Sequence, residues 1–353
     1  MKNSASSTLN LLPGLGIAAA IAVVATLIGR YLPILGSAMP AIVIGVLMAI
    51  FVRRPASWGP GLKFASKMVL QVAVVVLGTQ LSLRQVAEVG VESFPVMIST
   101  LTVCLLAAWL LGRAMKIDAD LNVLIGVGTA ICGASAIAAV SPVVKARNEA
   151  IAYAVSTIFL FNVLAVLIFP WLGHALGLTQ HEFGLFAGTA VNDTSSVVAT
   201  AGIYGSAALS FAVVVKLVRT LMIIPISLGL AALEARKEAA GSLGSGSQKA
   251  GTDSPTNSAA PRISLLGALK LIPWFLIGFL LASVLRSVGL VPDAAQAPLA
   301  QIAMFFISIA MAAIGLSTDV AGFRKAGLRP LMLGGLLWII VTATAIGAIF
   351  LMR

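Results

Sequence analysis

Two basic residues lie inside an apolar stretch of this sequence. Lys216 and Arg219 stand three positions apart in the run from Phe211 to Ile224, on one face of a predicted helix. A charge deep in a bilayer costs a few kcal/mol and normally faces a cavity. Arginine's planar fork suits an oxyanion or carboxylate, and lysine adds a point charge. The pair therefore predicts an anion site, and we expect Gln at either position to abolish anion flux while leaving folded protein in the membrane.

Two other roles for this pair stay open. Both side chains could instead reach an interface, because long basic side chains extend along apolar surface toward water. Lys216 could also simply pair with Asp193.

A short pattern occurs twice, as GTAICGASAIAA from 128 to 139 and as GTAVNDTSSVVA from 188 to 199. Each copy has apolar arms around a small, polar centre that disfavours a helix. In a membrane, freed backbone groups are tolerated only where protein or a water-filled cavity satisfies them. A duplicated, interrupted hydrophobic segment therefore indicates the substrate site of a secondary transporter.

The helical arm after each break would present free N–H groups and a positive dipole end to an anion. The predicted substrate-binding residues are Thr129, Cys132, Gly133, Ser135, Asn192, Asp193, Thr194, Ser195, Ser196, Lys216 and Arg219. Some of the small residues could serve helix packing instead. Asp193 has three candidate roles, as a counter-ion of Lys216, as a proton carrier, or as a ligand with Asn192 for a coupling cation such as Na⁺.

The composition is that of a polytopic membrane protein. Hydrophobic residues make up 59% of the 353 residues, charged residues 10%, and the mean hydropathy is +1.06. We expect an all-α membrane protein with about nine to eleven spans, inverted repeats and two discontinuous, re-entrant or crossing, helical motifs. The net charge of +11 comes from short loops beside the spans, which excludes a nucleic-acid role. Cys104 and Cys132 match neither a disulfide framework nor a metal site, so no cofactor is expected.

Charge counting favours a cytoplasmic N-terminus, since the basic loops at 53–63 and 113–116 then lie inside. A hairpin would return residues 145–147 to the same side. Its arms of about ten residues would each rise roughly 15 Å, half of a hydrocarbon core. A second hairpin from the opposite side would bring residues 192–193 to the depth of 132–133. Two unwound helices that cross each other are the rival architecture.

The chain is predicted to have three parts. Residues 1–235 form a membrane region with both motifs, 236–263 a flexible cytoplasmic linker rich in Gly, Ser and Ala, and 264–353 the remaining spans. A weaker similarity between residues 77–82 and 314–319 suggests an internal duplication.

The segments Gly126–Ile137, Asn192–Ser196 and Lys216–Arg219 together resemble bacterial inner-membrane proteins of the YeiH type, a family named for sulfate export. The similarity runs from about residue 14 to the C-terminus. It implies a secondary carrier akin to cation/proton antiporters and bile-acid-type symporters, moving sulfate or a small sulfonate. Export of an anion from a cell with a negative interior gains about 2.3 kcal/mol per charge per 100 mV.

Three other functions are weighed. A Na⁺- or H⁺-coupled carrier of an organic anion fits the same residues. A channel needs a continuous polar stripe, whereas the polar residues cluster at the motifs. An enzyme needs paired catalytic groups, yet His174 and His181 lie in a predicted loop and Asp193 is the sole acid deep in a span. We therefore expect no enzyme. The expected partners of this protein are the bilayer, a small anion and a coupling H⁺ or Na⁺. Whether it forms a homo-oligomer stays open.

Overall fold

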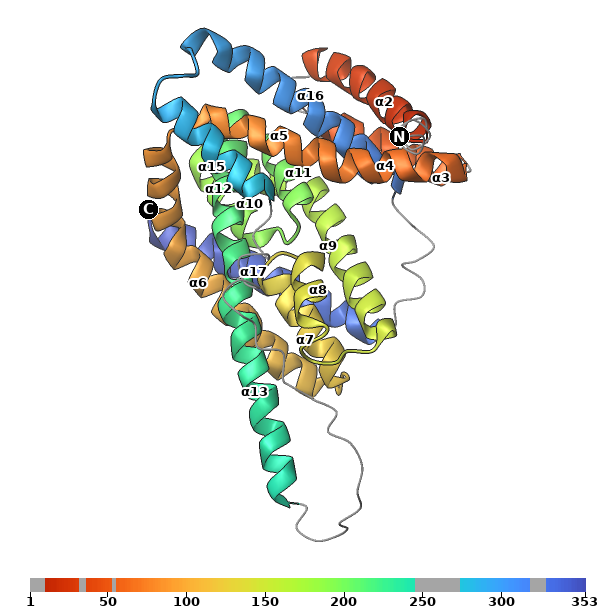
Figure 1. Cartoon of the computed structure of the whole chain (residues 1–353), viewed down its shortest axis with the longest axis vertical. Coiled ribbons are helices and arrows are strands. Elements are labelled where there is room, and N and C mark those ends of the chain that lie inside the picture. Colours follow the sequence, from red (N-terminus) through yellow and green to blue (C-terminus); the bar gives the residue numbers. More distant parts are fainter. Residues whose placement is uncertain (1–9, 32–35, 53–54, 245–273, 318–327) are drawn as a thin grey trace, which may run out of the picture.

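The computed structural model describes residues 10–31, 36–52, 55–244, 274–317 and 328–353. Every regular element in these ranges is a helix (Figure 1). Seven helical stretches are long and apolar enough, by length and composition, to cross a membrane. They are Leu12–Tyr31, Ala56–Gln80, Leu83–Ala114, Asn148–Ala175, Ser206–Leu233, Asp293–Ser317 and Leu328–Leu351. Three shorter apolar helices are Ala38–Phe51, Ala119–Ala130 and Trp274–Ser287. The expected all-α, multi-pass architecture is therefore confirmed.

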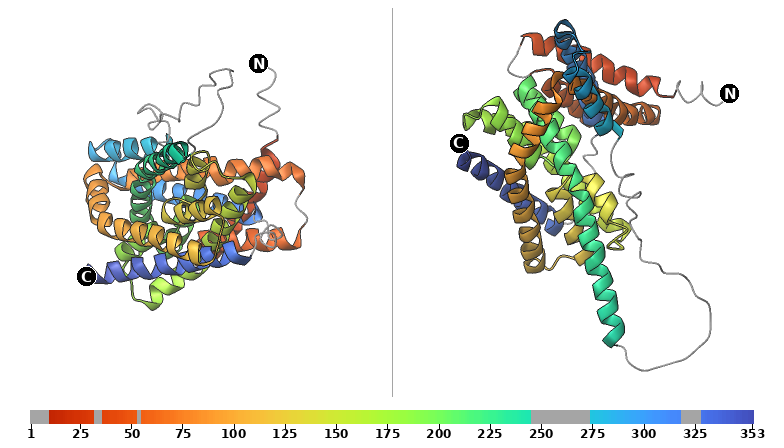
Figure 2. Two further views of the ribbon diagram at one scale, coloured as in Figure 1. Left: turned by 90° about the horizontal axis from the view of Figure 1, so that it is seen from below. Right: turned by 60° about the vertical axis from the view of Figure 1, so that its left-hand side comes forward.

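The helices form two bundles, which lie one above the other in Figure 1 and in the right-hand view of Figure 2. The first bundle contains α2 (Leu12–Tyr31), α3 (Ala38–Phe51), α4 (Gly59–Phe64), η3 (Ala65–Val69), α5 (Leu70–Leu77), α15 (Trp274–Ser287) and α16 (Asp293–Ser317). Glycines bring its backbones together, because a Cβ atom on Gly45 would lie 2.6 Å from the Ala312 carbonyl oxygen. Such close approach is how small residues hold membrane helices together.

The second, which we call the hairpin bundle, contains α6 (Leu83–Ala114), α7 (Ala119–Ala130), α8 (Ala134–Val140), α9 (Asn148–Ala175), α10 (Gln180–Ala190), α11 (Thr194–Tyr204), α12 (Ser206–Leu221) and α17 (Leu328–Leu351). The bundles meet where α11 contacts α3 and α16, and where α15 contacts α6. Both repeated motifs lie in the hairpin bundle.

The first motif folds as a helical hairpin of α7 and α8. Its two ends are joined by Arg147, whose guanidinium pairs with Asp118 and, at 3.3 Å, with Asp120. The chain therefore leaves this hairpin at the end where it entered. Lys116 and Lys145 stand at the same end, which we call the basic end (residues 113–120 and 141–148).

The second motif, α10 and α11, is also a hairpin. The Gln180 side chain receives a hydrogen bond from the Ala208 N–H at 3.0 Å and donates one to the Tyr204 carbonyl at 3.3 Å. The Tyr204 hydroxyl in turn bonds the Leu178 carbonyl. These contacts close the mouth of the hairpin at the opposite end of the bundle.

Helix α9 connects the two hairpins and fixes their relative direction. The first hairpin ends just before α9 begins, and the second starts just after α9 ends. Midway along α9, the Asn162 Oδ1 atom accepts hydrogen bonds from the backbone N–H groups of Asn192 at 3.1 Å and Asp193 at 3.3 Å. Since a helix of this length is about 42 Å long, the second break lies near the middle of a bilayer-spanning element.

The first break lies at the same level. A Cβ atom on Gly133 would lie 3.3 Å from the Ile158 side chain, one turn from Asn162 on α9, and 3.7 Å from the Asp193 Cβ atom. Two hairpins that enter from opposite ends thus meet at their breaks. Of the two architectures that the sequence left open, hairpins and crossing unwound helices, the structure has hairpins.

Some predicted segments fall outside this description. Helix α13 (Ile223–Gly244) extends into the predicted linker, and the remainder of 236–263 lies outside the described residues. So do Arg53, Arg54, and the Thr318 and Asp319 end of the second repeated hexapeptide.

Candidate functional site

The two buried cations of α12 lie directly against both breaks. Lys216 and Arg219 are fully buried, each 0% exposed. The Lys216 Nζ atom donates to the carbonyl oxygens of Ile131 at 2.8 Å and Val191 at 3.0 Å. One ammonium group therefore bonds one carbonyl from each break.

Arg219 makes the same connection one turn further along α12. Its Nε and Nη2 atoms donate to the carbonyls of Ala130 at 2.8 Å and Thr129 at 2.9 Å. Its Nη1 atom donates to the carbonyl of Thr189 and, at 3.4 Å, to that of Val191. The guanidinium thus bonds the last turns of α7 and α10 together.

These bonds have a clear electrostatic reason. The last carbonyls of a helix have no partner within that helix and form the negative end of its dipole. Two such ends, those of α7 and α10, meet at the breaks, and the two cations face them. The Arg219 guanidinium, which the sequence predicted to bind a solute, instead donates hydrogen bonds to backbone carbonyls. Lys216 does not pair with Asp193 in the described part of the chain, and neither cation reaches an interface.

The helical arms after the breaks begin differently from each other. Gly133, with φ of +68° and ψ of −129°, leads into α8 through a conformation that favours glycine. Asp193 is the N-cap of α11, where its Oδ2 atom accepts a hydrogen bond from the Ser195 N–H at 2.9 Å. Its carboxylate therefore already faces the positive end of that helix.

The balance of charge at the breaks is positive. Counted as protonated, the two basic side chains face two helix C-termini of about −0.5 each, and the Asp193 carboxylate is offset by two helix N-termini of about +0.5 each. Roughly one elementary positive charge is left over. No acidic side chain among the described residues is bonded to either cation, so this region favours an anion.

A cavity of about 410 Å³ opens beside the breaks, between the two bundles. Its lining residues are Ser66, Lys67, Leu70, Gln71, Val74 and Phe275 from the first bundle, Cys132, Ser135, Ala139, Asp193, Thr194, Ser195 and Thr220 from the hairpin bundle, and Ile223 from α13. From the breaks it follows α8 and the last turn of α12, both of which run toward the basic end. The cavity therefore leads from mid-depth toward one end of the molecule.

Five of the predicted site residues line this cavity, namely Cys132, Ser135, Asp193, Thr194 and Ser195. The other six lie at or near the breaks but do not line it: Thr129, Gly133, Asn192, Ser196, Lys216 and Arg219. Thr129 bonds its own helix, with its hydroxyl 2.8 Å from the Ile125 carbonyl. Asn192 is 1% exposed, and its Oδ1 atom has no partner in the described structure.

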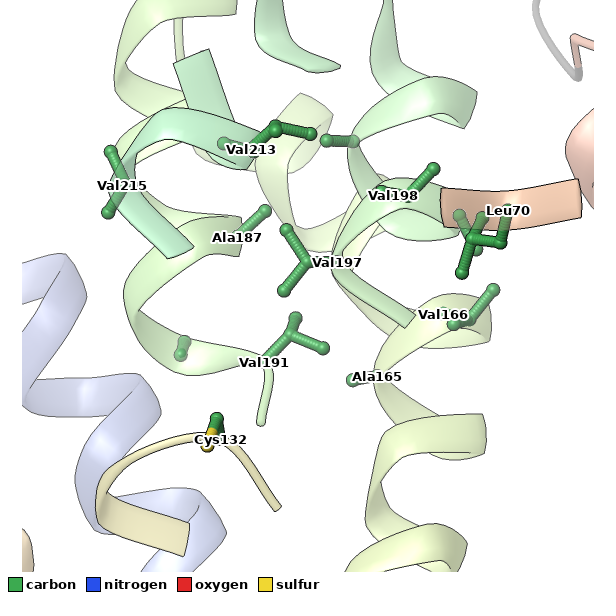
Figure 3. Packing of buried hydrophobic residues seen from close by; sticks show 14 of the residues in the cluster. Leu70, Cys132, Ala165, Val166, Ala187, Val191, Val197, Val198, Val213 and Val215 are labelled. Carbon is green, nitrogen blue, oxygen red and sulfur yellow. The ribbon is translucent and has the colours of Figure 1, made fainter. Parts of the chain in front are cut away.

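The breaks are otherwise packed in apolar side chains. Val191 and Val197 of the second hairpin lie with Cys132 of the first and Ala165 of α9 (Figure 3), and all four are buried. Such packing keeps water away from the carbonyls that hold the cations, which strengthens these bonds.

The first-bundle wall of the cavity contains Lys67, which sequence reasoning missed, and Gln71, for which it favoured a helix-to-helix hydrogen bond over cavity lining. Gln71 does both, since its Oε1 atom accepts a hydrogen bond from Trp274 Nε1 at 2.9 Å. Lys67 and Gln71 lie in the stretch Ala56–Gln80, which is long and apolar enough to span a membrane. Their spacing of four puts them on one helix face. This polar stripe could have indicated a cavity wall. However, Lys67 lies only four residues after Lys63, and the two lysines together resemble ordinary loop charges.

The fold and the site together define a multi-pass α-helical membrane protein with paired hairpins whose breaks meet at mid-depth. The family described as Conserved hypothetical protein 698 matches residues 13–334, and the chain belongs to this family. The resemblance to YeiH-type proteins drawn from the motifs is thereby confirmed.

Similar proteins share nearly the whole chain. A UPF0324 membrane protein of Streptococcus pyogenes serotype M3 is 41% identical over 346 residues, 97% of both chains. One from Streptococcus agalactiae serotype V is 42% identical over 336 residues, 93% of both. One from Fusobacterium nucleatum is 37% identical and covers 96% of this chain and 97% of that protein. No solved structure matches.

Proposed function

We propose that this protein is a secondary transporter that moves a small anion by alternating access at a site between its two hairpins. One observation carries the proposal: two broken helices meet at one depth against two buried basic side chains, beside a cavity that leads toward one end. Discontinuous helices at mid-depth are the architecture of many secondary transporters. We propose no enzymatic activity.

The direction of the cavity suits loading of the anion from the cytoplasm. The basic end carries Arg113, Lys116, Lys145 and Arg147, and such clusters favour the cytoplasm. With this orientation in a bacterial inner membrane, the cavity is open to the cytoplasm and the two hairpins are inverted repeats. We place the N-terminus in the cytoplasm as well, and the close approach of Gly14 on α2 to Gly61, two positions from the basic residue Lys63, supports this placement.

The proposed substrate is sulfate or a small sulfonate. Hydroxyl groups of Ser135, Thr194 and Ser195 line the cavity and supply hydrogen-bond donors suited to oxygen atoms around a tetrahedral centre. A dianion expelled from a cell with a negative interior gains about 2.3 kcal/mol per charge per 100 mV. The membrane potential alone could therefore drive export.

A second candidate is cation-coupled transport of an organic anion. It is favoured by the buried, unpartnered Oδ1 atom of Asn192 next to the carboxylate of Asp193. These oxygens could bind Na⁺, and Asp193 could instead carry a proton. Carbonyls of unwound segments often complete such sites, but here Lys216 and Arg219 occupy those of both breaks. A channel is the less supported alternative, because the cavity leads toward one end only.

Counterflow of labelled sulfate into proteoliposomes that contain the purified protein tests the proposal. Taurine, sulfite, isethionate and citrate are added in turn as competitors. We expect sulfite or a sulfonate to compete and the flux to respond to an imposed potential. If citrate is the only competitor that acts, sulfate and sulfonates are removed as substrates. If no counterflow occurs with any of the anions tested, anion transport is refuted. Asp193→Asn that keeps flux but loses its Na⁺ or pH dependence would establish coupling.

A further inference from the structure

We propose that Lys67 is the cation that contacts the transported anion, whereas Lys216 and Arg219 hold the two hairpins together. This inference rests on the proposed function and names the side chain of the first bundle that completes its site. Two different tasks, binding a solute and binding backbone, are then divided between separate basic residues.

The position of Lys67 places its side chain on the cavity face of its helix. Lys67, Leu70, Gln71 and Val74 line the cavity, and their spacing of three and four is that of one helix face. Met68 and Val72, on the neighbouring face, are exposed apolar residues of the kind that face lipid. Lys67 is itself exposed, so its ammonium group is accessible from the cavity.

The charge of Lys67 is available to a solute. In the described part of the chain, Lys67 is the only basic residue that lines the cavity, and its side chain makes no hydrogen bond or ion pair there. Lys216 and Arg219 are fully buried and bond five carbonyls between them. An anion in this cavity would therefore meet the ammonium of Lys67 first.

The local backbone around Lys67 is also unusual. Residues Ala65–Val69 form one π-helical turn within an otherwise α-helical stretch, and such turns are frequent at functional sites. Ser135, Thr194 and Ser195 line the same cavity from the hairpin bundle. An oxyanion there can thus accept hydrogen bonds from both bundles at once, with Lys67 as the flexible point charge.

Lys63 provides a matched control. It is an exposed lysine one turn earlier on α4 and does not line the cavity. Labelled sulfate binding to purified protein and sulfate counterflow are measured for wild type, Lys67→Gln, Lys67→Arg and Lys63→Gln. We expect Lys67→Gln to weaken apparent sulfate affinity about ten- to a hundredfold, the usual value of a charge-assisted hydrogen bond. Lys67→Arg should keep most of the affinity, and Lys63→Gln should match wild type.

The thermal unfolding midpoint of each variant is measured in parallel. It should be the same for Lys67→Gln and wild type, because no intramolecular bond of Lys67 is lost. Equal affinity of Lys67→Gln and wild type would overturn this inference and leave the transport proposal standing. An equal loss in Lys63→Gln would also overturn it, since a general surface potential would then explain the effect. Absence of sulfate binding and counterflow in wild type would overturn both.

Discussion

The bonds of Arg219 predict that its removal damages the fold and not only transport. Arg219→Leu deprives the carbonyls of Thr129, Ala130 and Thr189 of this donor, while the Val191 carbonyl keeps Lys216. A buried acceptor without a partner costs roughly 1–3 kcal/mol, so three cost about 3–9 kcal/mol. The variant also loses the desolvation cost of a buried charge, which puts the net destabilisation near the lower part of that range, about 3–5 kcal/mol.

The chain carries its own reporter for this measurement. Of its two cysteines, Cys132 lines the cavity and is 3% exposed, whereas Cys104 is 0% exposed and lies away from it, so the reaction of Cys104 with a fluorogenic maleimide reports the opening of the hairpin bundle. On heating in detergent, we expect the midpoint of dye reaction for Arg219→Leu to fall by about 10 °C. Arg84→Leu is the control, because the Arg84 side chain is 88% exposed and its pair with Glu88 contributes under about 1 kcal/mol.

A different outcome would refute this reasoning. If Arg219→Leu unfolds at the wild-type temperature and only anion flux is lost, Arg219 is a substrate ligand, as the sequence alone suggested. If Arg219→Leu unfolds at a lower temperature than wild type, the expectation from the sequence that a substitution of Arg219 leaves the protein folded is wrong.

Further predictions concern the breaks and the cavity. Gly133→Ala should lower the unfolding midpoint, since φ of +68° costs a residue with a Cβ atom about 1–3 kcal/mol. Gly59→Ala is the control and should leave the midpoint unchanged, because a Cβ atom added at Gly59 would have no atom within 4 Å. Asn162→Leu removes the acceptor of two backbone N–H groups and should cost about 2 kcal/mol or more, measured with the same dye. Ser135→Cys should react with a membrane-impermeant thiol reagent from the basic end only, and equal labelling from both sides in oriented vesicles would contradict the cavity's direction.

Much of this architecture could be predicted from the sequence because it follows from local composition. Apolar segment lengths indicated the helices, and the two interrupted motifs indicated both hairpins. Loop charges indicated that the first hairpin returns to its starting side, which the pairing of Arg147 with Asp118 and Asp120 matches.

The partners of the buried cations could not be predicted in this way. A pair of basic residues in an apolar run predicts a cavity or a counter-ion, but the free carbonyls at the ends of α7 and α10 become a binding site only when both hairpins meet. That meeting depends on Asn162 and on the packing against α9, which no pattern in the motifs encodes. Lys67 was missed for a related reason, because only the packing of the first bundle against the hairpin bundle makes its position part of a cavity.

The clasp formed by Lys216 and Arg219 has a mechanical consequence. Since a single helix, α12, grips the ends of both α7 and α10, neither hairpin can shift without dragging the other, and the two breaks behave as one rigid block. A transport cycle of the kind proposed above would then move the cavity wall of η3, α5 and α15 past that block, exposing the solute first on one face of the membrane and then on the other.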